Sequence, residues 1–152
     1  MNPQALEQYL HEHIPLSKAM QVCVLEAVPE RVIVSAPLAP NINHTESVFG
    51  GSASAVATLA AWSLVHVRLK SAGIASGIVI QNNTMSYERP IRGAFTARSF
   101  IKQPEAWDVF MRTLSRRGRA RIAVSAILDY QGQTAGNFEG NFVSIVAKPN
   151  PE

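Results

Sequence analysis

The chain has 152 residues, of which 47% are hydrophobic and 16% are charged, and it carries a formal charge of +3 with a pI of about 9.4. This length predicts one domain spanning residues 1–152, and the low charge predicts a surface buried against another subunit. Cys23 is the only cysteine, which excludes an intrachain disulfide and a cysteine zinc cluster. The first residues do not form a basic segment followed by an apolar one, so we expect a cytoplasmic protein.

The segment before residue 41 predicts one helix and one β-hairpin. Apolar residues at helical spacing favour an amphipathic helix over residues 3–13, which ends at Pro15. Residues 20–28 and 31–36 alternate between the two faces of a sheet and are separated by a turn, a pattern typical of paired strands. Pro37 then stops the sheet, because proline cannot donate to a strand ladder.

A polar loop followed by a long alanine-rich helix forms the centre of the chain. The helix is predicted to begin at Gly51 or Ser52 and to reach Lys70, and it has almost no polar face before its last turn. Such a helix is either buried in a core or crosses a membrane. Because Ser54 and Thr58 interrupt the apolar run, we expect a buried helix wrapped by a sheet, and no membrane span.

Strands dominate the remainder of the chain. The pattern predicts strands over residues 76–87, 91–101, 119–129 and 134–148, a helix or an irregular excursion over residues 104–115, and a tail over residues 149–152. Gly73 is the expected end of the long helix. A helix, two strands, a buried helix and then four strands predict an α+β fold in which an antiparallel sheet wraps around one long helix.

The loop and the helix start carry a family resemblance. Asn43-His44-Thr45, then Val48-Phe49-Gly50-Gly51-Ser52 and an alanine-rich helix, resemble the thioesterase-like domain found at the C-terminus of YiiD-type proteins. The resemblance extends from about Leu6 to Ala147 and implies the hotdog fold. It also implies a homodimer, or a tetramer of dimers, whose sheets join edge to edge. The acyl-thioester site is then expected at the subunit interface. No separate cofactor is expected, because the substrate carries its own phosphopantetheine arm.

Two glycines at the helix start are the expected site of catalysis. The N–H groups of a helix N-terminus are unpaired and carry partial positive charge, so the Gly51 N–H can polarise a thioester carbonyl. Gly50 lets substrate approach the backbone, and Phe49 and Ser52 flank it as expected substrate contacts. The simpler alternative is a tight turn into a helix. Ser52 is expected as the N-cap or the first helical residue rather than a nucleophile.

Three polar loop residues complete the expected catalytic group. The Asn43 amide can donate to the thioester carbonyl or hold a water, or it can form an Asx-turn. His44 is a candidate general base, although no acid lies between Ser52 and Ala72 to pair with it. Glu46 is a second candidate base, or a favourable acid near the helix N-terminus.

Two further groups are candidate substrate contacts. Asn82 and Asn83 interrupt an apolar strand, and either line the thioester tunnel or lie on an exposed face or bulge. The cluster at Arg116, Arg117, Arg119 and Arg121 suits the phosphates of coenzyme A or an acidic acyl carrier protein, or it is a solvated loop. Aromatic residues are not interleaved with this cluster, so nucleic acid is not expected as a partner. No metal-ligand spacing is present, so no metal site is predicted.

These residues support three alternative functions. The first is a thioesterase that hydrolyses acyl-CoA or acyl-acyl carrier protein. The second is decarboxylation of a malonyl thioester to an acetyl thioester, which needs hydrogen-bond donors at the enolate oxygen but no general base. The third is a module that binds thioesters without catalysis.

Overall fold

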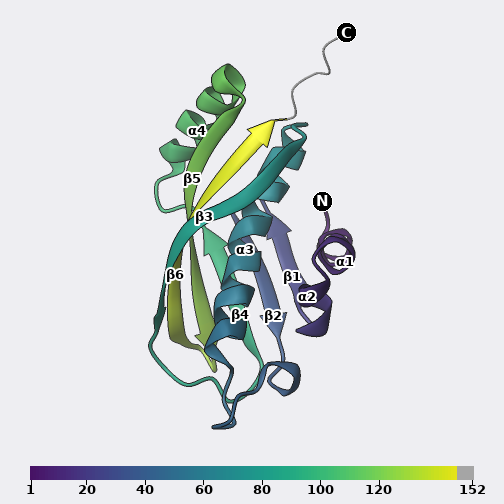
Figure 1. Ribbon diagram of the computed structural model, residues 1–152, viewed down its shortest axis with the longest axis vertical. Helices are drawn as coiled ribbons and strands as arrows, with labels where there is room; N and C mark the ends of the chain where they lie inside the picture. The colour runs from purple at the N-terminus through teal and green to yellow at the C-terminus, as the bar shows by residue number, and fades with distance from the viewer. Residues whose placement is uncertain (147–152) are drawn as a thin grey trace.

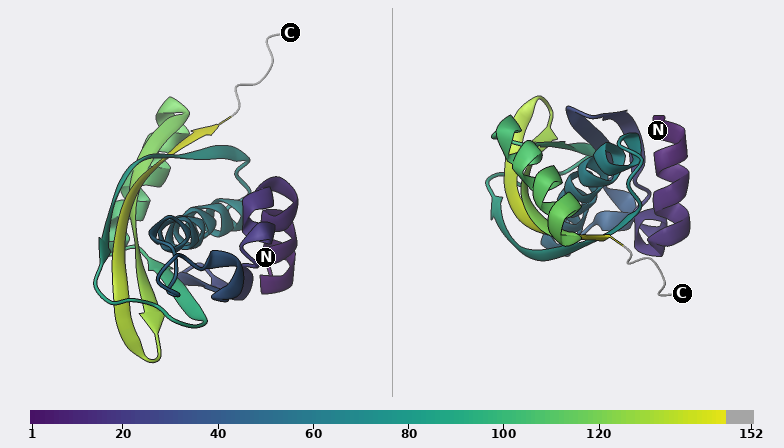
Figure 2. Two further views of the ribbon diagram at one scale, coloured as in Figure 1. Left: turned by 60° about the horizontal axis from the view of Figure 1, so that its bottom comes forward. Right: turned by 90° about the horizontal axis from the view of Figure 1, so that it is seen from above.

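The structure, a computed structural model, describes residues 1–146. In chain order the elements are α1 (Pro3–His13), α2 (Pro15–Ala19), β1 (Cys23–Val28), β2 (Arg31–Ala36), the 3₁₀ turn η1 (Ala39–Asn41), α3 (Gly50–Ser71), β3 (Ser76–Tyr87), β4 (Phe95–Phe100), α4 (Pro104–Arg117), β5 (Arg119–Tyr130) and β6 (Gln133–Val146). The six strands form one antiparallel sheet in the order β1-β2-β4-β5-β6-β3. The sheet curls around α3 (Figures 1 and 2), which confirms the predicted α+β hotdog architecture.

Helix α3 lies at the centre of the hydrophobic core. Its fully buried residues include Val56, Ala57, Ala60, Ala61 and Leu64, each with 0% exposure. Alanines keep this helix slim, so strands can pack closely around it, and its helix propensity is high. Burial on most of its circumference confirms the interpretation of an apolar helix as a core element. Among residues 1–146, no helix combines the length and hydrophobicity that crossing a bilayer requires.

Several element boundaries differ from the expected ones. Strand β1 begins at Cys23 rather than at residue 20, because α2 and a left-handed residue at Gln21 (φ 57°) occupy the preceding segment. Strand β4 begins at Phe95 rather than at residue 91. The last strand is described to Val146, and both its expected end at Lys148 and the expected tail over 149–152 lie outside the described residues. The other strands begin and end within one residue of the prediction.

Helix α1 covers one edge of the sheet and packs on α3. The Glu7 carboxylate accepts a hydrogen bond from the backbone N–H of Val24 in edge strand β1, at 2.8 Å. Tyr9 of α1 stacks on His66 of α3 with 4.6 Å between ring centroids, and His66 stacks on Trp62 at 4.9 Å. Burial, together with smaller effects of nearby positive charges, lowers the pKa of His66. A neutral imidazole therefore sits between α1 and α3 at neutral pH.

Helix α4 protects a part of β5 that β4 leaves without a partner. Strand β4 pairs with β5 only as far as Phe100 opposite Ser125, so the first residues of β5 have β6 as their single neighbour strand. Figure 1 shows α4 lying beside this part of β5, where Phe110 and Leu114 are buried. The Arg68 guanidinium lies 5.0 Å above the Trp107 ring and joins α4 to the end of α3.

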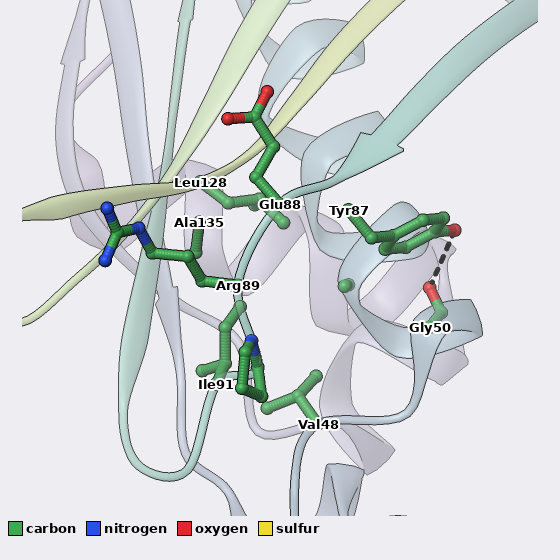
Figure 3. Close-up of a pocket in the computed structure, with 10 residues that line it drawn as sticks. Val48, Gly50, Tyr87, Glu88, Arg89, Ile91, Leu128 and Ala135 are labelled. Atoms are coloured by element: carbon green, nitrogen blue, oxygen red, sulfur yellow. Dashed lines mark hydrogen bonds between the residues drawn. The ribbon is translucent and has the colours of Figure 1, made fainter.

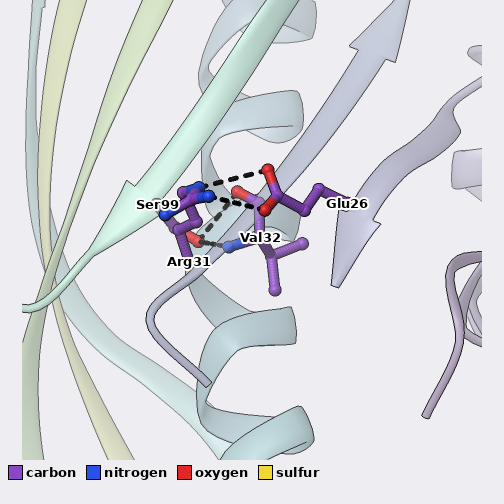
Figure 4. A network of polar contacts seen from close by, with 4 residues as sticks. All are labelled: Glu26, Arg31, Val32 and Ser99. Carbon is purple, nitrogen blue, oxygen red and sulfur yellow. Dashed lines mark hydrogen bonds and ion pairs between the residues drawn. The ribbon is translucent and has the colours of Figure 1, made fainter. Parts of the chain in front are cut away.

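A buried hydroxyl stabilises the pairing of β2 with β4. Ser99 is completely buried, and its hydroxyl accepts from the backbone N–H of Val32 and donates to the carbonyl of the same residue, each at 3.2 Å (Figure 4). Beside it, Arg31 and Glu26 form an exposed ion pair at 2.7 Å that closes the β1–β2 hairpin. A buried hydroxyl with two partners avoids the cost of an unsatisfied polar group.

Strand β3 is the open edge of the sheet. It pairs with β6 on one side only, and most of its residues are exposed on both faces. Val79 is 58% exposed and Ile80 is 37% exposed, although both are large and apolar. Long apolar edge strands are normally covered or paired, because their free N–H and C=O groups recruit another strand. Within residues 1–146 no further strand pairs with this edge, although the indole N–H of Trp62 in α3 donates to the carbonyl of Ile78 at 3.0 Å.

Candidate functional site

The loop before α3 is organised around the side chain of Asn43. Its Oδ1 atom accepts hydrogen bonds from the N–H of Thr45 (2.9 Å), the hydroxyl of Thr45 (3.0 Å), the N–H of Ser47 (3.1 Å) and the hydroxyl of Ser47 (3.3 Å). The Asx-turn, which was the alternative to a role in the site, is therefore present. The amide nitrogen of Asn43 has no partner within residues 1–146, so it remains a hydrogen-bond donor for a ligand.

Backbone hydrogen bonds hold the entry to α3. The N–H of Val48 donates to the carbonyl of Ile91 at 2.7 Å, and the N–H of Phe49 donates to the carbonyl of Asn41 at 2.8 Å. Asn41 is itself buried, and its amide donates to the carbonyls of Met20 and Pro37. These bonds hold Val48 and Phe49 in non-helical conformations, and the helix begins at the next residue.

The N-terminus of α3 carries free hydrogen-bond donors. The first helical hydrogen bond runs from Ala53 N–H to Phe49 O, and no side chain caps the helix. The N–H groups of Gly50, Gly51 and Ser52 consequently have no partner within residues 1–146. Such groups, with the partial positive charge of the helix N-terminus, stabilise negative charge on an acceptor oxygen.

A cavity of about 320 Å³ adjoins this helix start. Figure 3 shows its lining, which combines Gly50 with Tyr87 from the end of β3, and with Glu88 and Arg89 from the turn that follows. Apolar side chains, including Ile91, form the rest of the wall. The cavity therefore meets the helix N-terminus on one side and the open edge strand of the sheet on the other.

Two aromatic rings flank the glycine pair. The Tyr87 hydroxyl donates a hydrogen bond to the carbonyl of Gly50 at 3.2 Å (Figure 3). A Cβ atom on Gly50 would lie 3.5 Å from the Tyr87 ring, an ordinary contact, whereas a Cβ on Gly51 would lie 2.3 Å from Cε2 of Phe49. A Cβ on Gly51 would therefore displace the Phe49 ring, which is 56% exposed and has room to move.

The expected site residues of this region differ in their relation to the cavity. Gly50 lines it, whereas Asn43, Phe49 and Gly51 lie in the preceding loop or the first turn of α3 and are not part of its wall. Ser52 is the third helical residue, so its expected place as N-cap or first residue is wrong: Phe49 is the N-cap, because its backbone is the last non-helical one before α3.

The two candidate bases lie at the tip of the loop. The side chains of His44 and Glu46 are exposed and form no hydrogen bond within residues 1–146. Glu46 adopts a left-handed backbone conformation (φ 61°), which turns the loop back toward Ser47. Their roles as bases stay predictions.

The asparagines of β3 lie apart from this cavity. Asn82 pairs with Asn141, and its Oδ1 accepts from the Asn141 amide at 2.7 Å. Since Phe142 is buried against α3 and strand residues alternate between faces, Asn82 and Asn141 point to the opposite face of the sheet. Asn83 pairs with Gly140 and is exposed near the open edge. Within one chain, neither residue lines the cavity at Gly50.

The arginine cluster lies at the other end of the molecule. Arg116 and Arg117 are exposed in the last turn of α4, and Figure 1 shows this turn and the start of α3 at opposite ends of the long axis. A second cavity, of about 470 Å³, is lined by Arg117, Arg119 and Arg121. None of these arginines forms an ion pair within residues 1–146. In the same range, no three His, Cys, Asp or Glu side chains gather in a metal-binding arrangement.

Sequence reasoning missed Tyr87, Glu88 and Arg89 as parts of the site. They follow directly on a strand that was predicted correctly, and a polar run before Pro90 was the available signal. Nothing in the local sequence places Tyr87 beside Gly50, which lies 37 residues earlier. Only the curl of the sheet around α3 brings them together.

The curled sheet, the buried helix and the uncapped helix start define a hotdog-fold protein of the thioesterase-like class. The chain belongs to the family described as "Putative thioesterase (yiiD_Cterm)", which it matches over residues 3–146. This match confirms the resemblance carried by the loop and the glycine pair.

Solved structures agree with this assignment. A protein of unknown function from Chlorobaculum tepidum TLS is similar with 26% identity and a TM-score of 0.89, covering 96% of this chain and 98% of that one. A protein from Shewanella oneidensis described as a putative thioesterase has 28% identity and a TM-score of 0.83, covering 94% and 96%. A Pseudomonas aeruginosa protein described as a probable thioesterase has 20% identity and a TM-score of 0.80, covering 95% and 97%, and shows the shared fold.

Proposed function

We propose that this protein hydrolyses acyl thioesters, carried by coenzyme A or by an acyl carrier protein, at the N-terminus of α3. The observation that carries the proposal is the set of free N–H groups at Gly50, Gly51 and Ser52, the first of which lines a cavity of about 320 Å³. Donors aimed at the oxygen where charge develops are usually the largest single contribution to acyl-transfer catalysis.

In this mechanism the thioester oxygen accepts a hydrogen bond from the Gly51 N–H. Water attacks the polarised carbonyl carbon, a C–O bond forms, the C–S bond breaks, and the departing thiolate takes up a proton. The free amide of Asn43 either donates to the same oxygen or holds the attacking water. Glu46 or His44 accepts the proton of that water, which requires the exposed loop tip to close over bound substrate.

Decarboxylation of a malonyl thioester is the second candidate, and one observation favours it. No carboxylate or imidazole contacts the free N–H groups of α3 within residues 1–146, and both loop bases are exposed. The Glu88 carboxylate in the cavity wall accepts a hydrogen bond from the Asn137 amide at 2.6 Å. Loss of CO₂ from a malonyl thioester leaves an enolate and needs no base. The Gly51 N–H and the Asn43 amide would stabilise the enolate oxygen, which then collapses to an acetyl thioester after protonation at carbon.

A homodimer joined through β3 is part of the proposal. The exposed apolar residues Val79 and Ile80 support it, and so does the contrast with β1, whose edge Glu7 and α1 cover. Antiparallel pairing of two β3 strands would place the Ser76 end of one copy beside the Tyr87 end of the other. The arginine-lined end of one chain would thereby approach the thioester site of the second, where phosphates or an acidic carrier protein would meet it.

The experiment is to incubate the purified protein with acetyl-CoA, a longer acyl-CoA and malonyl-CoA, and with the same acyl groups on a carrier protein. Release of free thiol from any of them supports hydrolysis, whereas conversion of malonyl to acetyl thioester with no free thiol supports decarboxylation. If every thioester remains intact while binding is measurable, the protein is a binding module and both reactions are refuted. Arg117→Ala should raise KM for the preferred carrier, and Arg31→Ala, which removes an exposed arginine in the β1–β2 hairpin, serves as the control.

A further inference from the structure

The carbonyl of Gly50 and the N–H of Gly51 belong to one peptide group. Whatever binds that carbonyl therefore also sets the direction and the polarity of the N–H on the other side. The group that binds it from outside the helix is the Tyr87 hydroxyl, which donates to Gly50 O at 3.2 Å (Figure 3). A carbonyl oxygen has two lone pairs, so it accepts this bond in addition to a helical one.

The position of Tyr87 is determined by the sheet and not by the helix. It is the last residue of β3 and pairs with Gly136 of β6. A Cβ atom on Gly136 would lie 2.9 Å from the carbonyl oxygen of Ser86, so β3 and β6 approach very closely at this point. The strand end thus holds the phenol against the helix start, although the Tyr87 side chain is 58% exposed.

The other face of the same backbone is covered as well. The Phe49 ring occupies the space beside Gly51, and the Tyr87 ring lies beside Gly50. Both residues stay partly exposed, Tyr87 at 58% and Phe49 at 56%, so the rings contact the glycines without burying them. The peptide group between Gly50 and Gly51 is therefore held from outside the helix by the Tyr87 hydrogen bond, with one ring beside each glycine.

We propose that Tyr87 is a positioning residue that orients and polarises the Gly51 N–H toward the thioester oxygen. A hydrogen bond to the carbonyl of an amide strengthens donation by its N–H, because chains of hydrogen bonds polarise one another. The inference rests on the proposed function at the α3 N-terminus. Tyr87, at the end of β3, would then contribute to the reaction through the peptide group that joins Gly50 to Gly51.

The test is Tyr87→Phe, which keeps the ring and removes only the donor. Its control is Tyr9→Phe, which removes a phenol at the α1–α3 contact near Trp62 and His66. For Tyr87→Phe we expect kcat to fall about 3- to 10-fold with KM nearly unchanged, because the donor acts on developing charge. In the free protein, the amide proton resonance of Gly51 should move upfield. Tyr9→Phe should change neither quantity.

The possible results distinguish failure of the proposed function from failure of the role of Tyr87. Wild-type protein that turns over no thioester refutes the proposed function and this role with it. Wild-type turnover combined with an unchanged kcat in Tyr87→Phe refutes only the role of Tyr87. A rise in KM at constant kcat also overturns it, because Tyr87 would then contact substrate in the ground state rather than strengthen a donor to the transition state.

Discussion

The side chain of Asn43 has two separable functions, and substitution by aspartate divides them. Its Oδ1 atom holds the loop through bonds to Thr45 and Ser47, while its amide nitrogen is the free donor. Asn43→Asp keeps an acceptor oxygen in the same place and removes the donor. Asn43→Ala removes both functions, so the alanine variant by itself cannot distinguish a catalytic amide from a structural one.

The expected loss of folding stability follows from the four hydrogen bonds that Asn43 Oδ1 accepts. The two donors on Thr45 are exposed and can turn to water. The two on Ser47 are partly buried and lose this bond, although the Ser47 hydroxyl keeps the Thr45 hydroxyl at 3.2 Å. At about 0.5–1.5 kcal/mol for each of those two bonds, Asn43→Ala should lower stability by about 1–3 kcal/mol. For a domain of this size that corresponds to roughly 2–12 °C in Tm. Asn43→Asp should melt close to wild type at neutral pH.

The rate of turnover should depend on the free amide donor of Asn43. Removing one donor from a site that stabilises developing charge typically costs about 10²–10³-fold in rate. Asn43→Asp should therefore slow malonyl decarboxylation by about that factor, because a carboxylate cannot donate a hydrogen bond and repels the enolate. Hydrolysis of uncharged acyl groups should persist, because a carboxylate can serve as a base.

The assays are thermal melting by circular dichroism and product analysis with malonyl- and acetyl-CoA. If Asn43→Ala retains wild-type rates on every thioester that the protein turns over, the assignment of the site to this amide is wrong. If Asn43→Asp melts as low as Asn43→Ala, the division into two functions is wrong.

Three further predictions concern the core, the α1–α3 contact and the glycine pair. Ala60→Glu should unfold the domain or lower Tm by more than about 10 °C, because an unpaired buried charge costs several kcal/mol at a site with 0% exposure; unchanged melting would show that α3 is not the core. Because the pKa of His66 is lowered in the folded protein, its contribution to stability is present above the unfolded value of 6.5 and is lost as pH falls toward the folded value. Urea midpoints between pH 7.5 and 5 should decline more in the wild type than in His66→Phe, and parallel declines would contradict this. Gly51→Ala displaces the Phe49 ring and should reduce turnover more than Gly50→Ala, whose Cβ meets only an ordinary contact at 3.5 Å; equal activity of the two variants would argue against a function for that backbone.

Local sequence determined the secondary structure of this protein well. The period of the apolar residues predicts α1 and the six strands, with the starts of β1 and β4 placed too early, and a long apolar run with almost no polar face predicts α3. Strand β3 was predicted at its observed bounds, Ser76–Tyr87. For Asn43 the sequence favoured a role in the site and left the Asx-turn, which the structure contains, as the alternative. The glycine pair pointed to a helix start that a ligand can approach.

Tertiary structure decided which of these residues meet. Register and curl place Tyr87 against Gly50, turn Asn82 away from α3, and put Arg117 at the far end of the molecule from the helix start. None of these relations has a local signature, because a residue's neighbours across a sheet depend on strand order and pairing rather than on its own segment. The free donors of α3 are likewise a tertiary result: the non-helical backbone of Val48 and Phe49, held by bonds to distant carbonyls, leaves no side chain in position to cap them.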